Sequence, residues 1–212
     1  MATLRSHGRP VLLLDVMDTL VWDPAFTVLP ALFGTDLRGH YAEKDKEAFH
    51  MFERGELDED GFRRRYFLDG RDWDMPAVKR ALLDHYRWME GMRDLVRDLV
   101  HRGFQLHAMS NYSSWYAMVE QACGLSEAGV APTFLSYRMG VRKPDPRIYL
   151  EAARHLGVQP GACLFVDDRR KNVRGARAVG MPATRFTSAA ALRRLLTRFD
   201  PTLATATAHD ER

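Results

Sequence analysis

The distribution of apolar residues along the chain predicts alternating strands and helices. Residues 11–16 form a short apolar run that follows Pro10 and ends among acids, which is typical of a strand buried on both faces of a parallel sheet. Beyond residue 92, strand-like and helix-like periods alternate. This rhythm predicts strands at residues 104–110, 133–137, 162–168 and 182–186, and helices at residues 92–103, 113–124, 145–157, 169–180 and 188–199. Such alternation indicates βαβ units, and therefore an α/β fold with a Rossmann-like parallel sheet.

A helical pattern interrupts this rhythm after the first strand. Residues 28–92 contain charged and aromatic stretches of helical period, each closing near a glycine. We expect one folding unit whose core comprises residues 1–24 and 93–200, with an inserted all-helical subdomain at residues 25–92. The tail, residues 201–212, is polar and rich in small residues, and we expect it to be disordered.

Composition narrows the class of protein. The 212 residues are 46% hydrophobic and 28% charged, which is ordinary for a compact globular protein. The formal charge of +3 does not require nucleic-acid binding, and the longest apolar run is too short to span a bilayer. The start, MATLRSHGRP, lacks the apolar core of a secretory signal, and the two cysteines lie in apolar segments where free thiols are usual. We expect a cytosolic protein that binds a small molecule, with no nucleic-acid or membrane partner.

Polar side chains follow the predicted strands. The carboxyl ends of parallel strands meet at one edge of a sheet, where ligands bind. The polar residues found there are Asp15, Asp18, Ser110, Asn111, Lys143, Asp167 and Asp168. We expect three of these acids, from two strands, to share one pocket with the lysine and one hydroxyl.

This cluster suits phosphoryl transfer at a divalent metal. Carboxylates in one pocket raise each other's pKa unless a cation neutralises them, and Mg²⁺ prefers oxygen ligands while leaving room for a phosphate. Lys143 would balance carboxylate and phosphate charge, and Ser110 would donate to a phosphoryl oxygen. Asp15 could then attack phosphorus to give an aspartyl-phosphate that water hydrolyses. The residues therefore predict a Mg²⁺ cofactor and a phosphomonoester substrate.

Four strings carry a family resemblance. DVMDTL, MSNYS, RKPDP and FVDDRRKN occur in this order and resemble the four motifs of the haloacid dehalogenase-like (HAD) hydrolase superfamily. The resemblance implies that the helical insertion is a C1 cap. It also implies a nucleophile at Asp15, a phosphate ligand at Ser110, the third-motif lysine at Lys143, and metal-binding acids at Asp167 and Asp168.

A narrower resemblance extends along most of the chain. The strings LLLDVMDTLVWDP, FLDGRDWD, SNYSSWY, RKPDPRIYLEAARHLGV and FVDDRRKNV together resemble the plant-chloroplast type of HAD phosphatase that hydrolyses flavin mononucleotide (FMN). This resemblance makes FMN a candidate substrate. Because the cap selects the substrate in this superfamily, a related phosphorylated metabolite is the alternative.

The first motif departs from the usual D-x-D-G-T. Met17 stands where the family has its acid/base aspartate, and Asp18 stands where glycine is usual. A methionine cannot transfer a proton, although its backbone carbonyl, a metal ligand in the family, is unaffected by the change. General-acid help to a leaving group is typically worth ~10²–10⁴-fold in rate.

Three explanations of Met17 are open. A 2-haloacid dehalogenase also lacks the second acid, but that branch has tyrosine followed by glycine and lacks paired acids such as Asp167 and Asp168. A catalytically silent binding protein would leave the retention of Asp15 and Lys143 unexplained. We favour a phosphatase whose proton comes from Asp18, from a metal-bound water or from the substrate.

Further residues near the first and fourth motifs are candidates for supporting roles. Asp18 could act as the acid, or its side chain could stabilise its own turn by a hydrogen bond. Thr19 could orient Asp15 or cap the turn. Asn172 lies four residues after Asp168 and could line the pocket or face solvent.

Other candidates for substrate binding lie beyond those motifs. Asn111 follows the second predicted strand and could face the entrance. In the insertion, Trp73 could stack on a flat ring while Arg71 binds an anionic group. Packing inside the insertion is the alternative for such aromatic residues.

The leaving group offers a direct test of Met17. If no residue replaces the missing acid, aryl and acyl phosphates should react much faster than alkyl phosphates, because their leaving groups need no proton. Similar rates for p-nitrophenyl phosphate and FMN would show that another residue supplies the proton. The measurement is kcat/KM on both substrates.

Overall fold

A computed structural model describes residues 8–205 of the chain. Its strands are β1 (Val11–Leu14), β2 (Leu106–Ser110), β3 (Val130–Leu135), β4 (Cys163–Asp167) and β5 (Ala183–Arg185). They form one parallel sheet in the order β3-β2-β1-β4-β5. The predicted α/β fold with a parallel sheet is confirmed.

The central position of β1 follows from its apolar residues. Leu12, Leu13 and Leu14 are fully buried, and Leu12 is in register with Leu106 of β2 and Leu164 of β4. Successive side chains of a strand point to opposite faces, so Leu12 and Leu14 join one hydrophobic cluster and Leu13 joins another. Burying each leucine contributes about 1.5–3 kcal/mol, and this strand therefore anchors both halves of the core.

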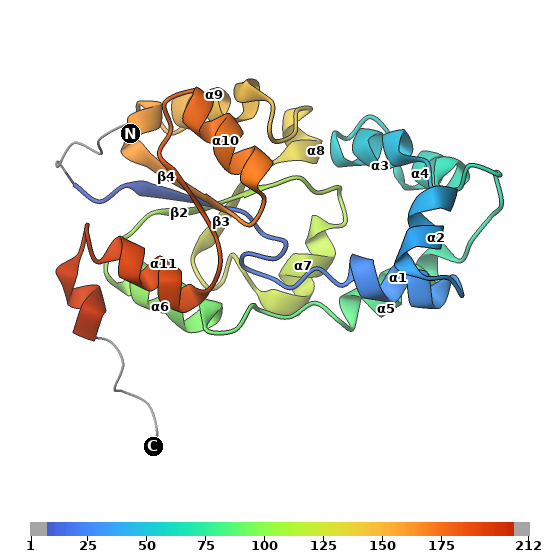
Figure 1. Cartoon of the computed structure of the whole chain (residues 1–212), viewed down its shortest axis with the longest axis horizontal. Coiled ribbons are helices and arrows are strands. Elements are labelled where there is room, and N and C mark those ends of the chain that lie inside the picture. The colour runs from blue at the N-terminus through green and yellow to red at the C-terminus, as the bar shows by residue number, and fades with distance from the viewer. Residues whose placement is uncertain (1–7, 206–212) are drawn as a thin grey trace, which may run out of the picture.

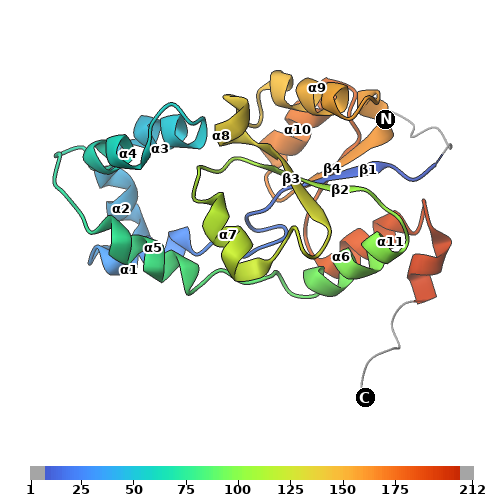
Figure 2. The ribbon, with the colours of Figure 1, turned by 180° about the vertical axis from the view of Figure 1, so that it is seen from behind.

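Helices cover both faces of the sheet (Figures 1 and 2). On one side lie α6 (Met92–His101), α7 (Tyr116–Cys123) and α11 (Ala189–Leu196), which pack on the cluster of Leu12. On the other side lie α9 (Pro146–His155) and α10 (Arg170–Ala178), which pack on the cluster of Leu13. Shorter helices are α8 (Ser136–Met139) and the 3₁₀ turns η1 (Pro160–Ala162) and η2 (Pro201–Thr205).

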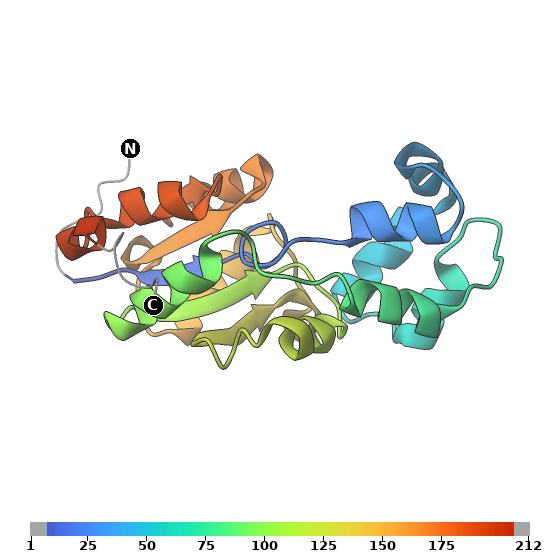
Figure 3. The same ribbon diagram turned by 90° about the horizontal axis from the view of Figure 1, so that it is seen from below.

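Five helices between β1 and β2 form a separate layer, which we call the helical insert. They are α1 (Ala25–Leu32), α2 (Leu37–Glu43), α3 (Lys46–Glu53), α4 (Glu59–Arg65) and α5 (Met75–Leu83). Figure 3 shows the insert beyond the carboxyl ends of the strands. Its two connecting segments pair with each other, since the Trp22 N–H donates to the Arg87 carbonyl at 2.9 Å and the Met89 N–H donates to the Leu20 carbonyl at 2.8 Å.

Sequence features explain why the insert is helical. Asp36, Asp45, Asp58 and Asp74 each precede a helix and accept a hydrogen bond from a first-turn N–H. Such a cap contributes about 0.5–2 kcal/mol. Aromatic side chains fill the interior, where the rings of Phe52 and Phe62 stack with centroids 4.3 Å apart. This aromatic interior is continuous with the hydrophobic cluster of Leu12 on one face of the sheet.

Two further features concern membrane-spanning helices and the cysteines. Between residues 8 and 205, no helix combines the length and the apolar character that crossing a membrane needs. Cys123 and Cys163 are free thiols and both are buried, as their apolar surroundings in the sequence predicted.

The third strand is shifted from the predicted residues 133–137. β3 spans Val130–Leu135, and Ser136 begins α8 instead of continuing the strand. The Ser136 hydroxyl donates to the Glu53 carbonyl at 2.5 Å, and this contact with the insert has no local sequence signal. Pro132 is tolerated because β3 lies at the edge of the sheet.

The start of the tail is ordered, which corrects the expected disorder from residue 201. Leu203 in η2 is fully buried, and the Thr202 N–H donates to Asp200 Oδ1 at 3.1 Å. Asp200 in turn pairs with Arg9 at 2.8 Å. These contacts join the turn to the core, while the predicted disorder of residues 206–212 lies outside the described residues.

The contribution of η2 to stability can be measured by substitution. Leu203→Ala should lower the free energy of unfolding by about 2–5 kcal/mol, because it leaves a cavity in the core. Leu68→Ala is the matched control: Leu68 is 69% exposed, and such surface changes stay within about 0.5 kcal/mol. Urea denaturation of both variants gives the comparison, and equal effects would show that η2 is not part of the core.

Candidate active site

Three carboxylates meet at the carboxyl edge of the sheet. Asp15 directly follows β1, Asp167 ends β4, and these strands are adjacent. Carboxylate oxygens of Asp15, Asp167 and Asp168 all lie within 4.8 Å of one another. The sheet thus gathers the acids of the first and fourth motifs into one cluster.

Lys143 lies between two of these acids. Its Nζ is 2.7 Å from Asp15 Oδ1 and 2.8 Å from Asp167 Oδ2, and it also donates to the Met109 carbonyl at 2.7 Å. Only 1% of the lysine side chain is exposed. All three donors of the ammonium group are therefore used, which fixes its position.

Asn111 holds the loop that carries Lys143. Its Nδ2 donates to the Lys143 carbonyl at 2.9 Å, and its Oδ1 accepts the Lys143 N–H at 2.7 Å. Asn111 lines the cavity at the site, but both groups of its side-chain amide are engaged by the Lys143 backbone. Its role in the structure is to position the lysine.

The carboxylates carry more negative charge than Lys143 can balance. Burial raises the pKa of Asp15 well above its ordinary value, and the opposing charge of Lys143 offsets it only in part. Burial acts in the same direction on Asp167, but the charge and hydrogen bond of Lys143 outweigh it and hold the pKa of Asp167 below its ordinary value. Burial, and then the charge of Asp167, raise the pKa of Asp168. A further cation would favour the ionised form of all three acids.

Asp168 has one buried carboxylate oxygen that is available to a cation. Its Oδ1 is buried and has no hydrogen-bond partner among residues 8–205. A buried carboxylate oxygen without a partner is costly. Oxygen donors clustered at this spacing suit Mg²⁺, so the chemistry of Asp15, Asp167 and Asp168 fits the predicted metal.

The side chains of Ser110 and Thr19 differ in whether they reach the cavity. Ser110 is 1% exposed, lines the cavity, and its Oγ has no hydrogen-bond partner in the described chain. A phosphoryl oxygen would satisfy it. Thr19 is fully buried and does not line the cavity. The Thr19 Oγ1 also has no hydrogen-bond partner among the described residues, and only its backbone N–H is engaged in the turn, donating to the Val16 carbonyl at 3.3 Å. The structure therefore does not bring Thr19, also a candidate for substrate binding, to the cavity.

Asn172 orients the acid beside it. Its Nδ2 donates to both oxygens of Asp167, at 3.1 Å and 3.0 Å. The residue is 2% exposed and lines the cavity, with its Oδ1 unpartnered within the described residues. The amide nitrogen therefore positions Asp167, and the oxygen remains for a ligand.

The two unusual residues of the first motif lie differently. Met17 lines the cavity with 8% of its surface exposed. Asp18 does not line it; its backbone has φ +56°, the left-handed region where glycine is favoured. Its Oδ1 accepts the Asp23 N–H at 3.1 Å. The candidate role of Asp18 as an acid is corrected to the stabilisation of this turn.

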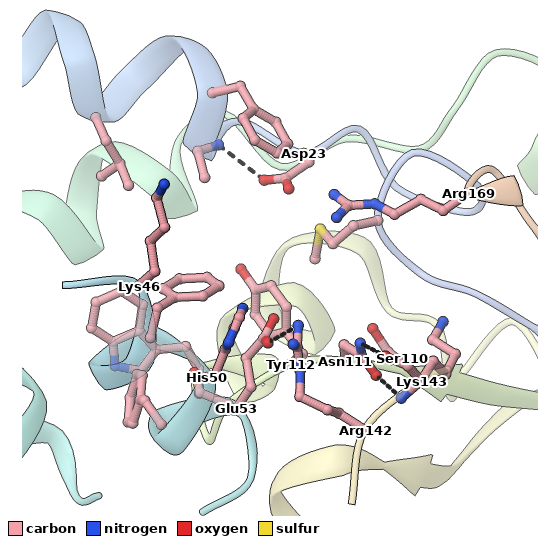
Figure 4. Close-up of a pocket in the computed structure, with 18 of the residues that line it drawn as sticks. Asp23, Lys46, His50, Glu53, Ser110, Asn111, Tyr112, Arg142, Lys143 and Arg169 are labelled. Atoms are coloured by element: carbon pink, nitrogen blue, oxygen red, sulfur yellow. Dashed lines mark hydrogen bonds and ion pairs between the residues drawn. The ribbon is translucent and has the colours of Figure 1, made fainter. Parts of the chain in front are cut away.

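A cavity of about 260 Å³ extends from the acids into the helical insert (Figure 4). Its apolar wall from the insert includes Phe26, Leu29, Tyr41, Phe49 and Phe52. Its cationic residues, besides Lys143, are Lys44, Lys46, Arg142, Arg169 and Lys171. The cavity is therefore suited to a molecule with an anionic end and an apolar or aromatic end.

Arg71 and Trp73 do not line this cavity, which corrects their assignment to substrate binding. Arg71 pairs with Glu43 and with Asp69, and its guanidinium lies 3.7 Å from the centre of the Phe67 ring. Trp73 Nε1 donates to the Arg63 carbonyl at 3.0 Å. Both side chains complete the packing of the insert, which was the alternative interpretation of these residues.

The structure adds charged residues to the site for which the motifs gave no role. Arg142 and Arg169 adjoin the motif residues Lys143 and Asp168, and this adjacency is a sequence signal that could have found them. Asp23 and Glu53 also line the cavity. They have no comparable signal, because only the placement of the insert brings them to the acids.

Comparison with known proteins places this geometry in a family. The profile of the haloacid dehalogenase-like hydrolases matches residues 12–180. Flavin mononucleotide hydrolase 1 of Arabidopsis thaliana, named as chloroplastic, is 40% identical over 188 residues, covering 89% of this chain and 76% of the relative. D-ribitol-5-phosphate phosphatase of Bacteroides thetaiotaomicron is 28% identical over 142 residues, covering 62% and 68%. A crystal structure of a HAD family enzyme from the same bacterium, in complex with magnesium and inorganic phosphate, matches the fold with a TM-score of 0.68 at 19% identity, covering 85% and 96%.

The buried position of Lys143 generates a stability prediction. Lys143→Met should lower the free energy of unfolding at neutral pH by about 3–5 kcal/mol, because two buried carboxylates lose their cation. Without the lysine the folded-state pKa of both acids rises, so the deficit should shrink as the pH falls toward about 5. Urea denaturation at the two pH values measures both effects.

Lys79→Met is the matched control for this variant. Lys79 pairs with Glu59 on the insert, with 32% of its side chain exposed, and a pair of this kind contributes no more than about 1 kcal/mol. Equal losses for the two variants would mean that the Lys143 contacts do not stabilise the site.

Proposed function

The chain belongs to the haloacid dehalogenase-like hydrolase family, and from this premise we propose that it is a Mg²⁺-dependent phosphatase that hydrolyses a small phosphomonoester through an aspartyl-phosphate. One observation carries the proposal: Asp15, Asp167 and Asp168 cluster at the sheet edge, where Lys143 pairs with Asp15 and Asp167. The unpartnered hydroxyl of Ser110 lines the same cavity as Asp15 and Lys143. This arrangement provides a nucleophile, a counter-charge and a phosphate ligand together.

The metal would be held by side chains already in place. Asp15, Asp167 and Asp168, with the backbone carbonyl of Met17, are the proposed ligands of Mg²⁺. The unpartnered Oδ1 of Asp168 supports this assignment. A bound Mg²⁺ neutralises carboxylate charge and polarises the phosphoryl group.

The side chains divide the chemical work. One carboxylate oxygen of Asp15 attacks phosphorus and the bond from phosphorus to the leaving oxygen breaks, which gives an aspartyl-phosphate on Asp15. Lys143 and Ser110 stabilise the charge on the transferring phosphoryl oxygens. Water then attacks the phosphorus of the intermediate, releasing phosphate and restoring the Asp15 carboxylate.

Two positioning residues hold the lysine and one of the acids in place. Asn111 clamps the Lys143 backbone, and Asn172 orients the Asp167 carboxylate. Fixed geometry lowers the barrier because little reorganisation accompanies the reaction. The site is therefore organised before substrate arrives.

The cavity favours a substrate with an anionic phosphate and an apolar or aromatic body. Aromatic residues such as Phe26, Tyr41 and Phe49 line the insert side. FMN is our candidate, supported by the 40% identity to a flavin mononucleotide hydrolase. The present cavity, about 260 Å³, lies below the ~300–1,000 Å³ of most ligand pockets. We propose that the insert acts as a cap that opens to admit the flavin ring and closes over the phosphate.

Compartment and partners remain predictions. We keep the expectation of a cytosolic protein with a small phosphorylated metabolite as its partner. The relative named as a chloroplast protein leaves that location open for this chain. Nucleic-acid and membrane partners are not part of the proposal.

The test is phosphate release from a panel of phosphomonoesters. FMN, p-nitrophenyl phosphate, acetyl phosphate and sugar phosphates are each assayed with Mg²⁺ and with EDTA. We expect metal-dependent release that Asp15→Asn reduces by at least about 10⁴-fold, because the nucleophile is lost. Asp58→Asn is the control, since the Asp58 carboxylate caps the start of α4 by accepting the Gly61 N–H and does not line the cavity.

Two outcomes would contradict the proposal. Halide release from 2-haloacids in EDTA would identify a dehalogenase. Mg²⁺ binding to a folded protein without turnover on any substrate would identify a catalytically silent binding protein, and Met17 would then mark the loss of catalysis.

A further inference from the structure

Met17 leaves the leaving group without its usual proton donor. If the proposed phosphatase function holds, the bond from Asp15 to phosphorus forms on one side while the leaving oxygen departs on the other. An alkyl leaving oxygen needs a proton at that moment. The donor must therefore line the cavity and be free to act.

Most titratable groups of the cavity are already occupied. Glu53 Oε2 is held in an ion pair, 2.5 Å from Arg142 Nη2, although burial raises the pKa of Glu53 to about 7 against the charge of Arg142. Lys143 uses all three donors. The Tyr112 hydroxyl pairs with that of Tyr86, and burial raises the pKa of Tyr112 well above its ordinary value. Burial lowers the pKa of His50, so the protonated imidazolium is disfavoured.

Asp23 is placed differently from these groups. It lies in the connecting segment that leads to α1 and it lines the cavity. Figure 4 shows it across the pocket from Ser110 and Lys143. Its Oδ1 accepts the Ala25 N–H at 3.0 Å, while its Oδ2 makes neither a hydrogen bond nor an ion pair within residues 8–205. One oxygen is therefore held and the other remains for a ligand.

We infer that Asp23 is the general acid that protonates the leaving oxygen, in the role that an aspartate at position 17 would fill. As Asp15 attacks phosphorus, the electron pair of the breaking phosphorus–oxygen bond passes to the leaving oxygen. That oxygen takes the carboxyl proton of Asp23 and leaves as an alcohol. The Asp23 carboxylate then accepts a proton from the water that attacks the aspartyl-phosphate, which regenerates both acids.

The surroundings of Asp23 favour its protonated form. Burial raises the pKa of Asp23 to about 6. Asp18 and Asp168 reinforce this shift and Arg169 opposes it. The other titratable groups that sense its charge are Tyr41, Lys44, Tyr86 and Tyr112. A carboxyl that titrates near the working pH is suited to give and take a proton.

Asp18 positions this acid. Its Oδ1 accepts the Asp23 N–H at 3.1 Å, which fixes the start of the connecting segment. The same segment pairs with the returning one through the Trp22 N–H and the Arg87 carbonyl, so Asp23 is attached to the entry of the insert. The two unusual residues of the first motif are thereby linked. Met17 stands in place of the usual acid, and Asp18 holds Asp23, which we infer to act instead.

The test compares leaving groups in Asp23→Asn. We expect kcat/KM for FMN, an alkyl phosphate, to fall by about 10²–10⁴-fold, while that for p-nitrophenyl phosphate falls by less than about 10-fold. The retained aryl activity shows that the site is folded. In the same background, Met17→Asp should restore alkyl turnover, because it returns an acid to position 17.

Controls separate this inference from the proposed function. Asp58→Asn should leave the ratio of the two rates unchanged. Equal losses on both substrates in Asp23→Asn would overturn the inference and indicate a structural role. If Asp23→Asn does not fold, Asp23→Glu takes its place: it keeps a carboxyl but displaces it, so the rate on FMN should fall more than the rate on p-nitrophenyl phosphate. Equal losses in that variant would again overturn the inference. A selective alkyl loss in Asp18→Asn instead would assign the proton to Asp18.

Failure of the proposed function has a separate signature. Wild-type protein that releases no phosphate from any substrate contradicts the phosphatase proposal itself. Wild-type protein that hydrolyses aryl but no alkyl phosphates, with FMN and sugar phosphates both inert, keeps the phosphatase proposal and overturns the role of Asp23.

Discussion

The buried contact of Lys143 with Asp15 and Asp167 is the interaction on which the site depends. One ammonium group 2.7 Å and 2.8 Å from two carboxylates offsets a burial that would be costly for any of these charges alone. The contact requires β1 and β4 to be neighbours, since each supplies one acid. It also requires the loop of Lys143 to be held, which Asn111 does through both groups of its amide. Sheet order, loop position and electrostatics are therefore parts of one arrangement.

A division of labour follows from where the residues lie. The sheet edge supplies the groups that act on phosphate, and these are rigid because they end or directly follow strands. The helical insert and its connecting segments supply the apolar wall, Asp23 and two of the additional cations, Lys44 and Lys46. In this account the leaving group lies against the helical insert, which we propose to be the movable cap. The choice of substrate and the supply of the proton then both depend on the closing of the insert over the sheet edge.

The residues of the sheet edge could be predicted from the sequence because their positions are local. An apolar run followed by an acid places Asp15, and the parallel order then brings Asp167 and Lys143 to it. Residues governed by long-range packing could not be placed in this way. Trp73 resembles a ligand platform in sequence, yet its indole donates to the backbone of the insert. Leu203 looks like part of a polar tail, but it is buried against the core.

Asp23 shows the same limit at the site itself. In sequence it is one acid between Trp22 and Pro24, with nothing to separate it from a residue that begins a helix. Only the turn held by Asp18 and the placement of the insert bring its carboxyl into the cavity. The structure therefore supplies a candidate for the role that the first motif lacks.

The central claim is that phosphate leaves through a covalent intermediate on Asp15, and the stereochemistry at phosphorus tests it most directly. A substrate whose phosphorothioate group is made chiral with oxygen isotopes is hydrolysed, and the configuration of the product is determined. Two successive displacements, first by Asp15 and then by water, predict retention of configuration. Inversion would mean that water attacks the substrate directly, and the account of Asp15 as nucleophile would be wrong.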